Sequence, residues 1–218
     1  MTAPAPDAGG GAAGEPTAGE PTVFIVDDEE SVRQSLRWLL ESIRLRVETF
    51  ASAEDFLARF DQSRPGCIVL DVRMPGMSGP ELMDRLNQAH AATPIIFLSA
   101  HGDVPLAVRS MKGGAVDFLQ KPYNNQQFLE RVQQALAQDA RERERRRKQS
   151  LLAASMNALT PREREILEKV VAGLSNKQIG KALAISHKTV EAHRARLMRK
   201  MGASSFAELL QLVLTGQS

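Results

Sequence analysis

The sequence lacks the features that mark secreted and membrane proteins. Its single cysteine, Cys67, excludes an internal disulfide and is typical of a reducing cytoplasm. No apolar run approaches the roughly 18 residues of a membrane span. The N-terminus has no basic region followed by an apolar core, which argues against a signal peptide. We therefore expect a cytoplasmic protein without a membrane partner.

Net charge is also small, at +2 over 218 residues, but it is unevenly distributed. Residues 1–136 carry −6, residues 137–156 carry +3 and residues 157–218 carry +5. The length suggests one large or two small domains. An acidic N-terminal part and a basic C-terminal part favour two domains with separate tasks, with polyanion binding in the C-terminal part.

The first part of the chain alternates short apolar runs with amphipathic stretches. Residues 1–21 have no large apolar side chain after Met1, so we expect a disordered tail. The apolar runs predict strands at residues 23–26, 46–50, 67–70, 94–98 and 116–119, and the stretches between them predict helices at 31–42, 53–60, 80–89, 104–111 and from 125 onward. This alternation predicts an α/β domain at 22–140, with a flavodoxin-like, doubly wound, five-stranded parallel sheet.

From residue 125 onward, the sequence pattern predicts only helices. The helix from residue 125 has no strong stop before 150, and residues 141–156 form a charged linker helix that we expect to loosen near 151–156. Two interpretations of the linker stay open, a solvated helix or one that also contacts DNA phosphates. Capping residues then predict four helices, at 161–172, 176–183, 188–201 and 206–214. Only residues 184–186 join the middle two, the tight connection of a helix-turn-helix, so 157–218 is predicted as a four-helix DNA-binding domain.

Polar side chains follow four of the five predicted strands where each strand ends. They are Asp27 and Asp28, Asp71, Ser99 and Lys121. The carboxyl ends of parallel strands meet at one edge, so we expect these side chains to converge. Three carboxylates require a cation, and oxygen ligands without His or Cys suit Mg²⁺. The chemistry we expect is attack by Asp71 on phosphorus, with Lys121 and Ser99 contacting the phosphoryl group.

These residues occur in a recognisable set of motifs. They are Asp27-Asp28, Leu70-Asp71-Val72-Arg73-Met74-Pro75 with Gly79, Ser99-Ala100 and Lys121-Pro122. Ser99 and Lys121 follow Asp71 by 28 and 50 residues. Residues 22–140 therefore resemble the receiver domain of two-component response regulators.

The resemblance implies specific roles for the clustered residues. Asp71 is the phosphoacceptor. Asp28 is a metal ligand supported by Asp27, and the carbonyl of Arg73 completes a Mg²⁺ site with Asp71. Ser99 and Phe118 form a switch pair, in which the hydroxyl turns toward the phosphoryl group and the ring moves inward. The alternative for Phe118 is a plain core aromatic.

Two further side chains bear on the fate of a phosphorylated Asp71. Arg73 and His101 lie two residues beyond Asp71 and Ser99, and we hypothesise that they restrict hydrolytic water. An alternative function is an aspartyl-phosphate phosphotransferase or phosphatase of the haloacid-dehalogenase kind. Such enzymes need a second acid two residues after the nucleophile, where this chain has Arg73. We therefore expect no enzyme beyond the protein's own phosphorylation.

The predicted helix 188–201 has two distinct faces. Val190, Leu197 and Met201 share the inner face, with His193 at its edge. The outer face has two short alanines among charges, which suits the major groove of DNA; an ordinary solvated face is the alternative. The candidate DNA contacts are Lys188, Thr189, Glu191, Ala192, Arg194, Ala195, Arg196 and Arg199, with Lys177 from the preceding helix.

The second domain also matches a known pattern. Its motifs are Leu159-Thr160-Pro161-Arg162-Glu163, Gly173-Leu174-Ser175-Asn176-Lys177 and Ser186-His187-Lys188-Thr189-Val190-Glu191-Ala192-His193. Residues 157–214 resemble the LuxR-type output domain of the NarL/FixJ response regulators, and the whole chain looks closest to FixJ-type regulators. The resemblance implies a sensor histidine kinase as phosphate donor and a homodimer when phosphorylated, with residues 206–214 as a dimer contact. It also implies double-stranded promoter DNA and RNA polymerase as partners.

Overall fold

The computed structural model describes residues 19–100 and 104–215. Most of the expected tail and His101 lie outside the described residues. The chain divides into two compact units, with the boundary between Arg141 and Glu142, and we describe the first unit and the second unit separately. Within the described residues, no helix is long and apolar enough to cross a membrane.

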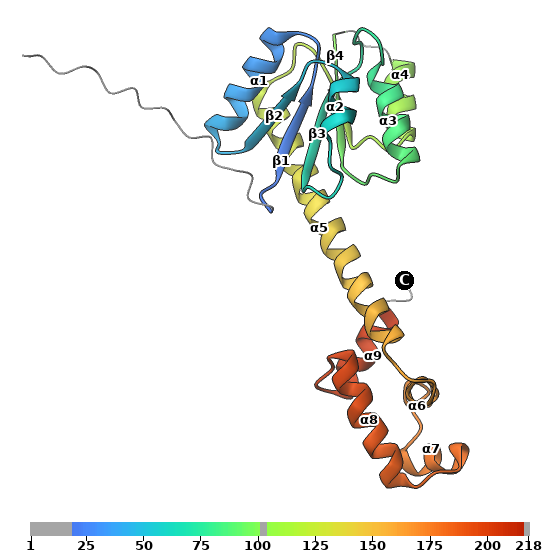
Figure 1. The fold of residues 1–218 in the computed structure, drawn as a ribbon. Helices are drawn as coiled ribbons and strands as arrows, with labels where there is room; N and C mark the ends of the chain where they lie inside the picture. The colour runs from blue at the N-terminus through green and yellow to red at the C-terminus, as the bar shows by residue number, and fades with distance from the viewer. Residues whose placement is uncertain (1–18, 101–103, 216–218) are drawn as a thin grey trace, which may run out of the picture. The chain divides into compact units, whose positions relative to one another are not determined.

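The first unit is the predicted doubly wound sheet (Figure 1). Its elements are β1 (Thr22–Val26), α1 (Glu30–Ser42), β2 (Arg46–Phe50), α2 (Ala53–Arg59), β3 (Gly66–Asp71), α3 (Gly79–Gln88), β4 (Ile95–Ser99), α4 (Val104–Lys112), β5 (Asp117–Gln120) and the start of α5 (Asn125–Asn157). The strands lie in the order β2-β1-β3-β4-β5, and every neighbouring pair is parallel. The fold class expected from the sequence is confirmed.

Alternation along the central strands builds a core on each face of the sheet. On β1, Phe24 belongs to the core with α2 and α3, whereas Ile25 belongs to the core with α1 and α5. The period of two explains why these strands read as continuous apolar runs, since both faces are covered. All of β3 is buried, so Asp71 stands at the end of a rigid strand.

The start of β3 is held by a buried carboxylate that the sequence patterns did not reveal. Asp139 of α5 accepts a hydrogen bond from the Gly66 N–H, at 2.8 Å, although the two residues are 73 positions apart. The neighbouring Cys67 is fully buried. Burial, with a smaller effect from the Asp139 charge, raises the pKa of the Cys67 thiol far above its ordinary value.

The second unit contains the end of α5 and four more helices. They are α6 (Pro161–Val171), α7 (Asn176–Leu183), α8 (His187–Met201) and α9 (Phe206–Thr215). A capping box at Thr160 begins α6 and the cap at Ser175 begins α7, both as predicted, and Ser175 also forms a capping box with Gln178. The Ser186 hydroxyl accepts from the Thr189 N–H to begin α8. The four-helix arrangement is confirmed.

The expected loosening of the chain near residues 151–156 is wrong. Helix α5 continues to Asn157, and Leu152 and Met156 pack against the core of the second unit. That stretch is rich in Leu, Ala and Met, which favour helix, and has no Gly or Pro to end it. The helix therefore continues through the predicted break, because these apolar side chains are partly buried and favour helix.

A lysine–carboxylate pair anchors α6 to α8 inside the second unit. Glu163 is buried, and its Oε2 accepts from Lys200 Nζ at 2.7 Å and from Thr160 N–H at 2.9 Å. The hydrogen bond from Lys200, followed by that from Thr160, lowers the pKa of Glu163 to about 2. The carboxylate is thus held in its charged form as part of the fold.

Candidate functional site

One lysine joins two carboxylates at the carboxyl edge of the sheet. Lys121 follows β5, and its Nζ donates to Asp27 Oδ2 at 3.0 Å and to Asp71 Oδ1 at 2.8 Å. The Asp27 side chain is 1% exposed and that of Asp71 11%. The structure therefore brings together three of the residues predicted to converge.

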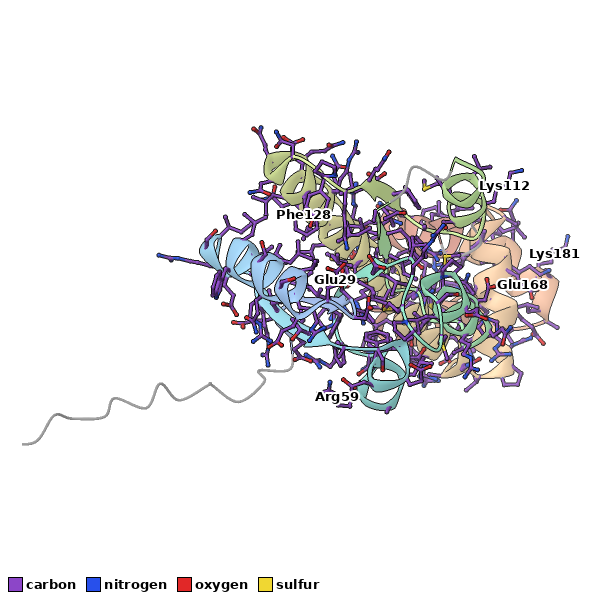
Figure 2. All side chains as sticks on the ribbon, turned by 90° about the horizontal axis from the view of Figure 1, so that it is seen from above. Glu29, Arg59, Lys112, Phe128, Glu168 and Lys181 are labelled. Carbon is purple, nitrogen blue, oxygen red and sulfur yellow. The ribbon has the colours of Figure 1, made fainter. Side chains whose placement is uncertain are left out.

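The backbone after each strand holds the second oxygen of each carboxylate. Asp27 Oδ1 accepts from the Glu29 N–H at 2.9 Å, and Asp71 Oδ2 accepts from the Arg73 N–H at 2.8 Å. Figure 2 draws the side chains as sticks and labels Glu29. In both places an Asp side chain bonds the backbone two residues on, a turn to which this residue type is suited. Each carboxylate is thus oriented by its own loop.

Burial and the lysine act in opposite directions on the charges of this cluster. Burial raises the pKa of Asp27, while hydrogen bonds from Lys121 and the Glu29 N–H oppose the rise. Burial alone would lower the pKa of Lys121, but hydrogen bonds to Asp71 and Asp27 outweigh it and raise the pKa to about 12. Lys121 is therefore a permanent cation in front of the Asp71 carboxylate.

Ser99 and Phe118 lie on the neighbouring strands β4 and β5. Ser99 is buried at the last position of β4, and its carbonyl accepts from the Lys121 N–H at 2.7 Å. Phe118 is half-buried, with its ring centroid 6.4 Å from that of Phe97 in the core. The backbone thus links the hydroxyl-bearing residue directly to the lysine.

The carboxylate set fits Mg²⁺ by chemistry, since every candidate ligand is an oxygen. The Asp28 side chain is exposed, and its carbonyl accepts from the Arg33 guanidinium at 2.9 Å. Among the residues that the structure describes, no three His, Cys, Asp or Glu side chains gather closely enough to hold a metal ion. Lys121 is the cation that bridges Asp27 and Asp71 in this arrangement.

Two contacts that sequence reasoning missed shape the loops around the site. The Arg33 guanidinium donates to the carbonyls of Asp27, at 2.7 Å, and Asp28. Glu54 Oε1 of α2 accepts from the Met77 N–H at 3.0 Å in the loop after β3. The Arg33 bonds span only five and six positions but belong to no capping or turn motif, and the Glu54 bond joins residues 23 positions apart.

Glycine at position 79 allows that loop to return against the strand. A Cβ there would lie 2.3 Å from the Asp71 carbonyl oxygen and 3.0 Å from the Phe97 ring. No side chain fits at that distance from backbone. Gly79 is therefore required for α3 to begin directly beside the end of β3, where its N–H donates to the Val72 carbonyl at 3.1 Å.

The face of α8 divides as predicted into a buried and an exposed side. Val190, Leu197 and Met201 are buried. The exposed candidates are Lys188, Thr189, Glu191, Ala192, Ala195, Arg196 and Arg199, and Lys177 is exposed on α7. The second unit thus presents cations and short side chains on one helix face.

Arg194 differs from the other candidates. It is half-buried, and its guanidinium donates to Asn176 Oδ1 at the start of α7. The neighbouring His193 is half-buried, and its Nδ1 has no hydrogen-bond partner in the described part of the chain. The Arg194–Asn176 contact ties the two helices of the helix-turn-helix together, which no sequence motif indicated.

Comparisons with known proteins match both units. A family model described as the response regulator receiver domain matches residues 23–133, and one described as bacterial regulatory proteins of the luxR family matches residues 157–213. Transcriptional regulatory protein TdiR of Thauera aromatica is 48% identical over 93% of this chain and 89% of that protein. Transcriptional regulatory protein FixJ of Bradyrhizobium diazoefficiens is 40% identical over 88% of this chain and 94% of FixJ.

Two solved structures match the chain over nearly all of its length. The response regulator StyR is 45% identical, with a TM-score of 0.84 over 89% of this chain and 98% of StyR. Full-length FixJ from B. japonicum is 38% identical, with a TM-score of 0.56 over 91% of this chain and 98% of FixJ. A receiver domain followed by a LuxR-type DNA-binding domain defines a transcriptional response regulator. This chain belongs to the NarL/FixJ family of two-component response regulators.

Proposed function

We propose that phosphorylation of Asp71 controls binding of promoter DNA by α8. The receiver would span residues 22–140 and the output domain 157–218, joined by the linker 141–156 and preceded by the tail 1–21. The observation that carries the proposal is the Lys121 ammonium, 2.8 Å from the Asp71 carboxylate and 3.0 Å from that of Asp27. A buried carboxylate fixed opposite a permanent cation is suited to accept a phosphoryl group.

The phosphoryl donor would be a phosphohistidine of a sensor histidine kinase. An oxygen of Asp71 forms a bond to phosphorus while the bond from phosphorus to the imidazole nitrogen breaks, and that nitrogen keeps the electron pair. Lys121 already contacts Asp71 and neutralises charge on the phosphoryl oxygens. The product is an acyl phosphate on Asp71.

Mg²⁺ is the cofactor that the oxygen ligands suit. Asp27, Asp28 and Asp71, with the carbonyl of Arg73, would hold it. Because the Asp28 side chain is exposed and no three such side chains gather closely in the described residues, ion binding would have to draw Asp28 toward the other two. When bound, the ion supplies further positive charge to the transferring group. The burial of the Asp27 and Asp71 carboxylates supports this assignment, because a buried carboxylate gains from a second cation.

Phosphorylation would then act on the β4–β5 edge. The Ser99 hydroxyl turns toward the phosphoryl group and Phe118 moves inward, a path supported by the hydrogen bond from Lys121 N–H to the Ser99 carbonyl. Dimerisation follows, with residues 206–214 as one contact, and two output domains bind two half-sites. RNA polymerase is a further partner, and the cytoplasm is the location.

The exposed face of α8 would enter the major groove of DNA. Lys188, Arg196 and Arg199 reach phosphates or guanine, Glu191 accepts from cytosine, and Thr189 and Lys177 add contacts at the edge. Ala192 and Ala195 allow close approach. The half-buried Arg194 would position α8 through Asn176, which revises its role from a direct contact.

We expect no enzymatic turnover beyond self-phosphorylation. The position two residues after Asp71 is the exposed Arg73, where a phosphatase of the haloacid-dehalogenase kind needs an acid. The relatives named above are transcriptional regulators, which supports the same conclusion.

The experiment that tests the proposal measures DNA binding with and without acetyl phosphate. Fluorescence anisotropy on a DNA site selected from a random pool should show tighter binding by the treated wild type. Asp71→Asn should abolish the difference. Asp84→Asn, the same change at an exposed position of α3, should leave it intact. An unchanged affinity and oligomeric state in the treated wild type would contradict the proposal.

A further inference from the structure

A cavity of about 370 Å³ lies within the second unit, apart from the exposed face of α8. Its wall is built from the last turns of α5, from Met201 on the buried side of α8 and from Leu212 of α9. This volume falls within the range of about 300–1,000 Å³ that is common for sites of small molecules. Neither the phosphoacceptor chemistry nor the DNA contacts use it, and it shares only Leu212 with the proposed dimer contact at residues 206–214.

Part of the cavity wall is apolar and in contact with solvent. Leu151, Leu152, Met201 and Leu212 line it, and Leu151 is 57% exposed. Leu152 and Leu212 are only half-buried against the core of the second unit. An apolar ligand would remove this surface from water, which is favourable in proportion to the area covered.

Two cations, Arg145 and Lys148, line the same cavity, and no acidic side chain does so in the described part of the chain. Glu142 holds Arg145 with both oxygens, at 2.8 Å each. Lys148 reaches Glu144 only at 3.5 Å, and Glu144 also pairs with Arg147 at 3.1 Å. Lys148 is therefore the cation best placed to accept another anionic partner.

We propose that this cavity binds an amphipathic monocarboxylate. The hydrocarbon part lies against the leucines and Met201, and the carboxylate pairs with Lys148. The apolar wall disfavours a nucleic-acid phosphate as the occupant, and the cations disfavour a neutral hydrocarbon. Because α5, α8 and α9 all contribute to the wall, such a ligand would stabilise the output domain independently of Asp71.

The test is isothermal titration calorimetry on the full-length protein with decanoate and with decanol, which has the same chain without the charge. Decanoate should bind more tightly than decanol. Lys148→Glu should weaken decanoate binding by about 5- to 10-fold and leave decanol unchanged. Arg147→Glu is the matched control, since Arg147 shares the pairing with Glu144 but does not line the cavity. It should change decanoate affinity by less than about twofold.

Replacing the exposed Leu151 tests the apolar part, and Leu151→Asn should weaken both ligands. The proposal is overturned if neither ligand binds the wild type, or if Lys148→Glu and Arg147→Glu weaken decanoate equally. Sedimentation velocity tests whether a second copy of the chain covers this face instead of a ligand. A wild type that dimerises, binds no ligand and becomes monomeric through Leu151→Asn would show that this face is an interface instead. The ligand-binding outcomes do not depend on phosphorylation, so they leave the proposed phosphorylation of Asp71 and the DNA contacts of α8 untouched. The dimer outcome would instead test the proposed dimer contact at residues 206–214, which include Leu212.

Discussion

Each unit of the molecule holds a lysine against a buried carboxylate, yet the two pairs differ. In the first unit, burial of Asp27 prevails and its pKa is raised, although Lys121 lies 3.0 Å away. In the second unit, hydrogen bonds to Glu163 prevail and its pKa falls to about 2. Burial thus dominates at Asp27, whereas hydrogen bonds dominate at Glu163, which forms a structural ion pair between α6 and α8. We propose that the first pair serves phosphoryl transfer, whereas the second serves the fold.

The largest expected effect comes from removing Lys121, and removal of Lys200 is the matched comparison in the second unit. Lys121→Met should abolish the effect of acetyl phosphate on DNA affinity, because the ammonium that faces the phosphoryl group is then lost. Lys200→Met should retain that effect but lower the unfolding free energy of the second unit by about 1–2 kcal/mol, since Glu163 loses its main partner. Fluorescence anisotropy measures the effect of acetyl phosphate on DNA affinity, and amide hydrogen exchange measures the unfolding free energy of each unit. Equal losses of the phosphate effect in both variants would remove the distinction.

Two glycines, one in each unit, extend the comparison to the free energy of unfolding. Gly79→Ala places a Cβ 2.3 Å from the Asp71 carbonyl oxygen, so the backbone must move, and we expect a loss of roughly 3 kcal/mol. Gly202→Ala, after α8, meets no atom within 4 Å and only the cost of a positive φ of 67°, about 1 kcal/mol. Scanning calorimetry should rank the two in this order. The reverse order would show that the β3–α3 loop yields easily.

The two carboxylates should also respond to pH with opposite sign. Glu163 has a lowered pKa, so its contribution to stability is present above its unfolded value of 4.5 and is lost as the pH falls toward about 2. Asp27 has a raised pKa, so its contribution is full below 3.8 and is lost as the pH rises through the folded value. Denaturation of wild type, Glu163→Gln and Asp27→Asn across this range measures both. Parallel pH profiles for the two variants would contradict the contrast.

The smallest expected effect separates two arginines of α8. Arg196→Ala should reduce the slope of log affinity against log salt by about 1, as for a lost phosphate contact. Arg194→Ala should leave the slope unchanged and lower stability by about 1 kcal/mol, because its guanidinium bonds Asn176. DNA titrations at several salt concentrations, with thermal melts, distinguish the two. A reduced slope for Arg194→Ala would assign it to DNA.

Most of the fold was predictable because its determinants are local. The strands carry uninterrupted apolar runs, and Thr160, Ser175 and Ser186 begin helices where their hydroxyls cap the backbone. The end of α5 was misjudged, although Leu, Ala and Met at 151–156 favour helix. Packing of Leu152 and Met156 against residues distant in sequence adds to that local propensity, and no spacing reveals it.

The site follows the same rule. Convergence of Asp27, Asp71 and Lys121 follows from parallel strands ending at one edge, so the sequence was sufficient to predict it. Arg33 and Glu54, by contrast, hold the surrounding loops from other helices and have no motif. Contacts of this kind depend on side-chain packing that no spacing reveals.

The burial of Cys67 has a practical consequence. Thiol reactivity requires the thiolate, and a fully buried thiol with a raised pKa supplies almost none at neutral pH. Because Cys67 is the one cysteine in the sequence, a cysteine introduced on an exposed position would be the only reactive thiol. The native protein therefore serves directly as a background for single-site fluorescent or spin labelling.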